Sequence, residues 1–138
     1  MESGLIAASE ILKVRGKVVP STLEDVTLAA AMSDGTIVKG ESEITLAHKR
    51  IKSLAILPEN AAATQGAITA IMKADVLILG PGSLYTSVIV NVLVPEIKKA
   101  ILASKAVKIY VCNVMTQPGE TDGYGAYEHV KAIVDHAG

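Results

Sequence analysis

VLILGPGSLYTS, residues 76–87, is the stretch that decides the fold. Four apolar residues run into a loop of glycine, proline and small polar residues, a pattern typical of a buried strand and the turn that leaves it. A helical pattern follows from Pro95, because proline suits a first helical turn, and residues 108–112 form another apolar run. Strands separated by helices pair in parallel through right-handed crossovers, so this stretch predicts an α/β fold.

The same alternation extends to both sides of this stretch. We expect residues 51–138 to form a βαβαβα portion of a Rossmann-like, α/β/α fold, with three strands parallel in one sheet and helices on its faces. The strands are expected at 51–57, 76–79 and 108–112, and the helices at 61–73, 95–104 and 126–136.

The N-terminal part of the chain carries a different pattern. Apolar TLAAAM and β-prone TIVKGESEITLA flank Asp34 and Gly35, and Asp-Gly between two such runs is the strongest short-range signal of a β-hairpin. We therefore expect an antiparallel hairpin lobe over residues 20–50. Apolar residues at helical spacing predict a short helix before it, over about residues 4–13.

Composition indicates one compact domain, with 138 residues of which 50% are hydrophobic and 20% charged. A net charge of −1 supplies no clustered positive field, so we expect no nucleic-acid partner. No apolar stretch reaches the roughly 18 residues that span a bilayer, so we expect no membrane insertion. The single Cys112 fits a reducing compartment, which predicts a cytoplasmic protein.

The loop after residues 76–79 is the first candidate site. Gly80 and Gly82 allow a ligand to approach the backbone, Ser83 and Thr86 offer hydroxyl groups, and the N–H groups of a following helix start favour an anion such as phosphate. The dinucleotide fingerprint fails, because Tyr85 stands at its third glycine, and the Walker pattern is absent. The alternative is a tight turn followed by a serine or threonine helix cap.

The second candidate is the loop NVMTQPGETDGY, residues 113–124, which leaves the next strand at the same sheet edge. Its length exceeds a minimal strand-to-helix turn, and longer loops are more often functional. The alternative is that Pro118 and Gly119 form a turn, and that Thr121 or Asp122 caps the last helix.

No other group of residues predicts a metal site or a catalytic nucleophile. His48, His129 and His136 have no acidic or cysteine companion at metal-ligand spacing, so we expect no metal site and place these histidines on the surface. The basic cluster from His48 to Lys52 is interpreted as a solvated strand edge. No GxSxG nucleophile elbow occurs.

Several longer motifs resemble those of one family. GPGSLYTS after VLIL, then NVLVP and YVCNVMTQPGETDGY, with RGKVVPSTLEDVTLAA and DGTIVKGES nearer the start, closely resemble the bacterial gluconeogenesis factor family, often called YvcK. That family belongs to the CofD-like group, related to 2-phospho-lactate transferase. The resemblance extends over residues 8–137, and it identifies residues 1–138 as a single, partial CofD-like domain.

The resemblance implies a Rossmann-like protein that binds nucleotide sugars, notably UDP-N-acetylglucosamine. It also implies links to cell shape, cell-wall precursor supply and growth on gluconeogenic carbon sources. The transferase branch of the group instead moves a phospholactyl group with the help of magnesium. By resemblance, the phosphate-side residues are Gly80, Gly82, Ser83 and Thr86, and the matching residues of the second loop are Asn113, Thr116 and Asp122.

The chain departs from the family pattern in two places. Family members are about twice as long and open with a GGGTG loop and a DDGGSSG-like segment, neither of which occurs here, and Val90 replaces a usual proline. Three hypotheses follow: a regulatory nucleotide-sugar binding protein with no cofactor in this part, a transferase that needs Mg²⁺ in its full length, or a fragment that binds nothing.

A mean hydropathy of +0.41 predicts a homo-oligomer, because large exposed apolar surfaces usually bind another protein surface.

Overall fold

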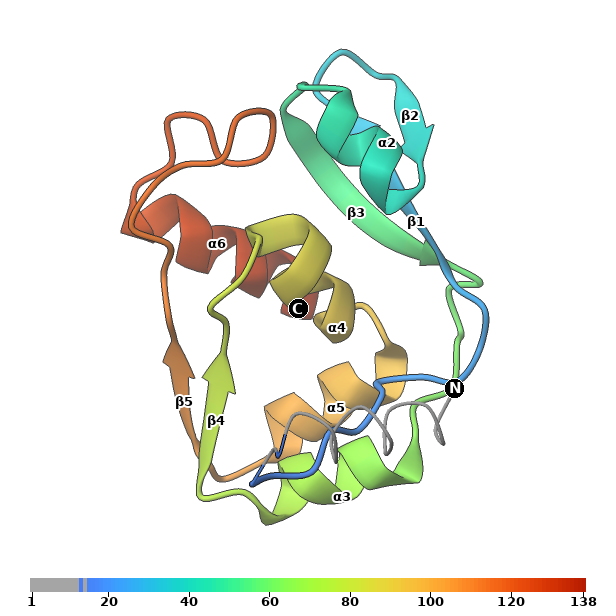
Figure 1. The fold of residues 1–138 in the computed structure, drawn as a ribbon, viewed down its shortest axis with the longest axis vertical. Coiled ribbons are helices and arrows are strands. Elements are labelled where there is room, and N and C mark those ends of the chain that lie inside the picture. Colours follow the sequence, from blue (N-terminus) through green and yellow to red (C-terminus); the bar gives the residue numbers. More distant parts are fainter. Residues whose placement is uncertain (1–12, 14) are drawn as a thin grey trace.

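A computed structural model describes residue 13 and residues 15–138 (Figure 1). The helix predicted over residues 4–13 therefore falls outside the described residues, except for Lys13. In chain order the elements are β1 (Thr27–Met32), β2 (Ile37–Lys39), α2 (Glu41–Leu46), β3 (Ile51–Leu57), α3 (Gln65–Lys73), β4 (Val76–Leu79), the π-helix η1 (Leu84–Ile89), α4 (Val90–Val92), α5 (Pro95–Ala103), β5 (Val107–Tyr110) and α6 (Ala126–Ala137).

β4 and β5 form the parallel pair that the sequence of residues 76–112 predicts. They pair in register from Val76 opposite Val107 to Leu79 opposite Tyr110. The connection between them contains η1, α4 and α5, and α5 begins with Pro95 in its first turn, as expected. The parallel orientation of these two strands is confirmed.

The prediction that residues 51–57 form a third parallel strand is wrong. β3 pairs antiparallel with β1, with Thr27 opposite Leu57, in a separate sheet of order β2-β1-β3. A short apolar run shows that a strand forms but does not show which neighbour it pairs with, and equal stretches of 18 residues separate β3 from β1 and from β4. α3 consequently connects the two sheets (Figure 1).

The hairpin at Asp34 and Gly35 is confirmed, because β1 and β2 pair antiparallel on either side of it. Its predicted continuation as β structure is wrong over residues 41–46, which form α2. The chain turns at Gly40, whose φ is 97°, and the acidic Glu41 and Glu43 occupy the first turn of the helix, where negative charge is favourable.

Helix positions follow the predictions with small shifts. α3 begins at Gln65 and not at residue 61, because the Thr64 side chain accepts a hydrogen bond from the N–H of Ala67 and so caps the helix there. α3 and α5 lie side by side below the centre of the molecule (Figure 1). The largest fully buried apolar side chains come from the lobe, η1 and α4 together: Met32, Ile44, Leu84, Ile89 and Val92.

Over the part of the chain that the structure describes, none of the helices combines the length and the apolar character that crossing a membrane requires.

Candidate functional site: two joined loops at one sheet edge

The loops that follow β4 and β5 leave the same edge of the parallel pair, and two side-chain hydrogen bonds join them. The amide Nδ2 of Asn113 donates to the carbonyl oxygen of Gly82 at 2.9 Å. The amide Nε2 of Gln117 donates to Oγ of Ser83, also at 2.9 Å. The second loop therefore fixes the peptide between Gly82 and Ser83 in place.

Local geometry favours glycine at both positions of the first loop, and most strongly at Gly80. Gly80 has a φ of 88°, and a Cβ atom there would lie 3.0 Å from the carbonyl oxygen of Val111. A Cβ atom on Gly82 would lie 3.1 Å from Cβ of Ser87, in the first turns of η1. Because both residues lack a Cβ atom, the chain can turn sharply from β4 into η1, and Gly80 can adopt a positive φ that favours glycine.

Ser83 precedes η1 but does not cap it through its side chain. Its carbonyl oxygen accepts from the N–H groups of Ser87 and Val88 at 3.0 Å each, while its hydroxyl oxygen accepts from Gln117. The alternative of a serine helix cap is therefore wrong. The backbone N–H groups of Gly82 and Ser83 find no hydrogen-bond acceptor among the described residues.

Glu120 is a buried carboxylate at the start of η1, and its side chain is only 3% exposed. It accepts a hydrogen bond from the N–H of Tyr85 at 3.3 Å and from the hydroxyl of Thr86 at 3.2 Å. A negative charge is favourable at the N-terminus of a helix. The N–H of Tyr85 already donates to Glu120, so it is not available to a ligand. An anion bound at this edge would instead accept from the N–H groups of Gly82 and Ser83.

The second loop is closed by its own hydrogen bonds. Oγ1 of Thr121 accepts from the N–H of Gln117 at 2.8 Å, and Oδ2 of Asp122 accepts from the N–H of Gly119 at 2.7 Å. The last helix is capped elsewhere, since the N–H of Gly125 donates to the carboxylate of Glu128 at 2.8 Å. The alternative drawn from the sequence is therefore half right: the turn at Pro118 and Gly119 is confirmed, since the N–H of Glu120 donates to the carbonyl oxygen of Gln117 at 3.1 Å, but capping by Thr121 or Asp122 is wrong.

The structure brings some predicted residues together and separates others. Gly82, Ser83 and Asn113 meet at the joined loops, whereas the hydroxyl of Thr86 turns inward to Glu120. Thr116 lines a separate cavity of about 200 Å³ together with Asn113. Sequence analysis missed Gln117 and Glu120 as partners of the first loop, and their only signal was their place in a long polar loop at the same sheet edge.

The surface position predicted for the histidines is wrong for His129, which is 2% exposed. Its Nδ1 lies 2.9 Å from the hydroxyl oxygen of Tyr110, and burial raises the pKa of that tyrosine to about 12. His136 is half-buried, and its Nε2 accepts from the backbone N–H of Leu54 at 3.2 Å, which joins α6 to β3. These two histidines hold elements together.

Comparison with known proteins gives a consistent result. A family model described as 2-phospho-L-lactate transferase CofD matches residues 1–138. The chain is 52% identical over 135 residues to the gluconeogenesis factor of Halalkalibacterium halodurans and 48% identical over 130 residues to that of Bacillus subtilis. These matches cover 98% and 94% of this chain but only 42% and 41% of the two relatives.

A solved structure agrees with these sequence matches. A crystal structure of a Bacillus halodurans protein superposes with a TM-score of 0.93 at 51% sequence identity, and the match covers 99% of this chain and 44% of that protein. The predicted α/β, Rossmann-like fold class is confirmed by this match and by the parallel pair. The chain spans less than half the length of the relatives it matches.

Proposed function

The chain belongs to the CofD family, and we propose that it supplies the phosphate-side part of a nucleotide-sugar site in a protein of the gluconeogenesis factor type. The observation that carries this proposal is the pair of backbone N–H groups at Gly82 and Ser83, which have no acceptor among the described residues. Successive backbone N–H groups before a helix are suited to bind phosphate.

The joined loops support this proposal by their rigidity. Asn113 and Gln117 fix the Gly82–Ser83 peptide before any ligand arrives, so that binding costs less ordering of the loop. The hydroxyl of Ser83 accepts from Gln117 and keeps its own proton to donate to a phosphate oxygen. The ligand proposed from the family resemblance is UDP-N-acetylglucosamine.

We propose the biological role from the family resemblance, with the names of the relatives as support. Proteins of 52% and 48% identity are called gluconeogenesis factor, so we assign this chain a role in carbon metabolism, with supply of cell-wall precursors and cell shape as its expected consequences. Residues outside this chain would hold the base, since the relatives are more than twice as long.

A magnesium-dependent transferase is the second function that the family name suggests. A magnesium site needs only one or two carboxylates besides phosphates and waters, and the carboxylates near the joined loops are those of Glu120 and Asp122. Both carboxylate oxygens of Glu120 already accept hydrogen bonds, and Asp122 bonds within its own loop. No observation on this chain favours the transferase over the binding protein.

Calorimetry with UDP-N-acetylglucosamine tests the proposal on the whole protein. We expect Ser83→Ala to weaken binding by about 1 kcal/mol, and up to roughly 3 kcal/mol if the phosphate acceptor is charged and buried. Ser42→Ala, on the exposed side of α2, is the matched control and leaves the affinity unchanged. Residues 1–138 on their own bind weakly or not at all.

Two results would contradict the proposal. Unchanged affinity in both Ser83→Ala and Gly82→Val would show that the first loop is only a structural turn. Tight binding by residues 1–138 alone would place the nucleotide-sugar site entirely within this chain and remove the need for a second part.

A further inference from the structure

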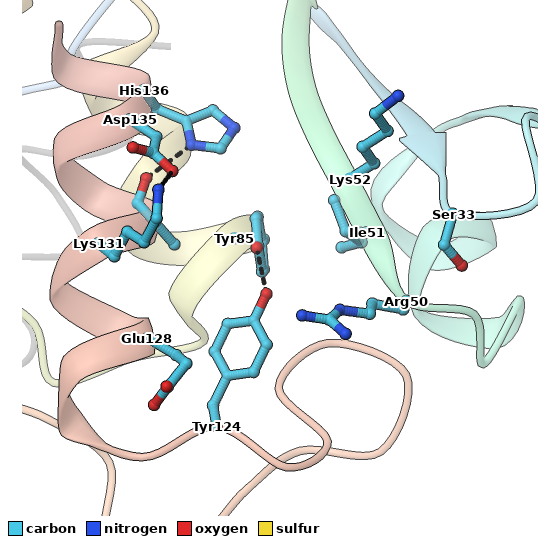
Figure 2. A pocket seen from close by; sticks show the side chains of 11 residues that line it. Ser33, Arg50, Ile51, Lys52, Tyr85, Tyr124, Glu128, Lys131, Asp135 and His136 are labelled. Carbon is cyan, nitrogen blue, oxygen red and sulfur yellow. Dashed lines mark hydrogen bonds and ion pairs between the residues drawn. The ribbon is translucent and has the colours of Figure 1, made fainter.

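A cavity of about 470 Å³ lies between β3 of the antiparallel lobe and α6 (Figure 2). Arg50, Ile51 and Lys52 form its lobe side, and Tyr85, Tyr124 and the outer turns of α6 form the opposite side. We propose that this cavity binds the phosphoryl group of a small molecule, with the guanidinium of Arg50 and the hydroxyl pair of Tyr85 and Tyr124 as its ligands.

Arg50 is placed to bind an anion. Its guanidinium points toward the tyrosine pair in Figure 2, and its Cζ lies 5.7 Å from the centroid of the Tyr124 ring. A contact with the ring face orients the cation while its N–H groups keep their capacity to donate. Within the described part of the chain, neither Arg50 nor Lys52 forms an ion pair.

The two tyrosines supply a further donor. Their hydroxyl oxygens lie 2.8 Å apart, so one hydroxyl donates to the other. The second hydroxyl proton is then available to a guest, because each phenol carries only one. Burial raises the pKa of Tyr85 above its ordinary value, which keeps its phenol protonated and able to donate.

The acidic side chains of the cavity are already engaged. Asp135 pairs with Lys131 at 2.6 Å, and the carboxylate of Glu128 accepts from the N–H of Gly125 at 2.8 Å. His136 accepts from Leu54 through Nε2, and so adds no positive charge in this bonded state. Among the cationic side chains of the cavity, only Lys131 forms an ion pair within the described residues, so Arg50 and Lys52 offset the charge of Glu128 and leave one net positive charge. The fork of N–H donors on Arg50 suits the oxygens of a phosphoryl group.

The cavity is separate from the proposed nucleotide-sugar site, because none of Gly80, Gly82, Ser83 and Asn113 lines it. Its two sides are also held at a fixed distance. The bond from Leu54 to His136 joins β3 to α6, and the second loop rests on the lobe, where a Cβ atom on Gly119 would lie 2.8 Å from Cα of His48. The donors are therefore in place before a ligand binds.

Titration of the whole protein with inorganic phosphate, followed by NMR at the ring signals of Tyr124, tests the proposal. We expect saturable shifts in the wild type and an affinity lower by about tenfold or more in Arg50→Gln, because a charge-assisted hydrogen bond is lost. Arg15→Gln is the matched control, since Arg15 is the only other arginine of the sequence and lies outside the cavity, and it keeps the wild-type affinity. Arg50→Lys, which keeps the charge but loses the fork of donors, binds with intermediate affinity.

Several outcomes would overturn the proposal. Tyr124 signals that do not move with phosphate, or that titrate equally in the wild type and Arg50→Gln, show that Arg50 holds no phosphoryl group. Acetate that binds as tightly as phosphate shows that the cavity has no preference for a phosphoryl group. Because the reporter is Tyr124 and the ligand is inorganic phosphate, a failure of the nucleotide-sugar proposal does not change this measurement.

Discussion

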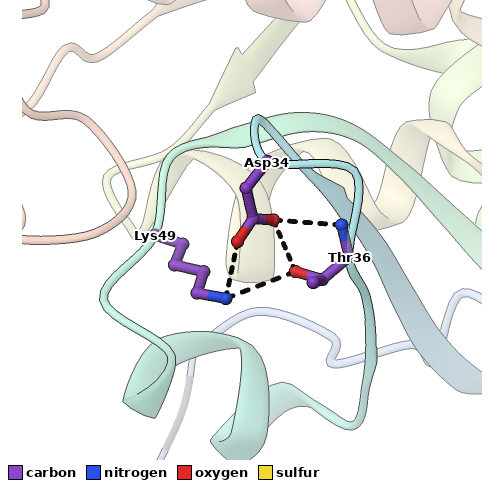
Figure 3. Close-up of polar contacts among 3 residues, drawn as sticks. All are labelled: Asp34, Thr36 and Lys49. Carbon is purple, nitrogen blue, oxygen red and sulfur yellow. Dashed lines mark hydrogen bonds and ion pairs between the residues drawn. The ribbon is translucent and has the colours of Figure 1, made fainter.

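At the tip of the β1–β2 hairpin, the carboxylate of Asp34 accepts three hydrogen bonds (Figure 3). The backbone N–H and the hydroxyl of Thr36 donate to Oδ1 at 3.0 and 2.6 Å, and Nζ of Lys49 donates to Oδ2 at 2.7 Å. One residue thus closes the turn and ties it to the segment that enters β3. The hydrogen bond from Lys49, followed by those from Thr36, holds the pKa of Asp34 well below its ordinary value.

This shift predicts a pH dependence of stability. Because the pKa is lower in the folded state, the contribution of Asp34 is fully present above its unfolded pKa of about 3.9 and is lost as the pH falls through the lower, folded value. We expect Asp34→Asn to lose less stability than the wild type between neutral pH and the acid range below about pH 4. The effect is small, because exposed ion pairs contribute little.

Thermal melts across this pH range measure the difference. Asp25→Asn is the control, because Asp25 is exposed and accepts no hydrogen bond among the described residues. Parallel pH profiles for the wild type and Asp34→Asn would show that Asp34 is not linked to folding.

At the scale of elements, η1 depends on a residue from a distant loop. The N–H of Tyr85 and the hydroxyl of Thr86 both donate to Glu120, which lies 35 residues after Tyr85 in the chain. Buried donors that lose their acceptor destabilise the folded state by the full cost of removing them from water. The second loop and η1 are therefore expected to form together.

We predict that Glu120→Ala lowers the free energy of unfolding by about 1 to 3 kcal/mol, because two buried donors lose their acceptor. Glu120→Gln should cost less, since its amide oxygen can still accept. Urea unfolding of the whole protein measures both changes, with the exposed Glu59→Ala as the control. If Glu120→Ala proves as harmless as Glu59→Ala, the buried carboxylate does not stabilise the joined loops.

At the scale of the whole molecule, the parallel pair leaves an apolar face uncovered. Val76 and Val107 face each other across the pair, as do Ile78 and Ile109, and these four side chains are 46%, 63%, 63% and 44% exposed. A contiguous apolar surface of this kind usually binds another surface. In the longer relatives more chain is available to cover it, since this chain spans only 42% of the Halalkalibacterium halodurans protein.

This face predicts self-association of residues 1–138 on their own. Sedimentation at micromolar concentrations should show a dimer or higher oligomer, and Ile78→Lys should shift it toward monomer, because burying an unpaired charge is costly. Val114→Lys is the control, since Val114 is fully exposed and belongs to the loop after β5 and not to the strand pair. A wild-type chain that sediments as a monomer would contradict the prediction.

The candidate site was predictable only in part. The loops were expected at one sheet edge because parallel strands end on the same side, and Gly82, Ser83 and Asn113 do meet there. Arg50, in contrast, was interpreted as part of a solvated strand edge. It is exposed and directly precedes the edge strand β3, but only the packing of the second loop against the lobe places it over Tyr124.

By itself the sequence determined the hairpin at Asp34 and Gly35, the helix start at Pro95 and the parallel pairing of β4 and β5, because the first two depend on neighbouring residues and the third on the helical connection between the two strands. Only the tertiary structure decided that β3 joins β1 and that residues 41–46 form α2. It also decided that the carboxylate of Glu120 occupies the start of η1. Strand partners and buried polar contacts are chosen between segments far apart in the chain, and a local pattern carries no information on which of them will meet.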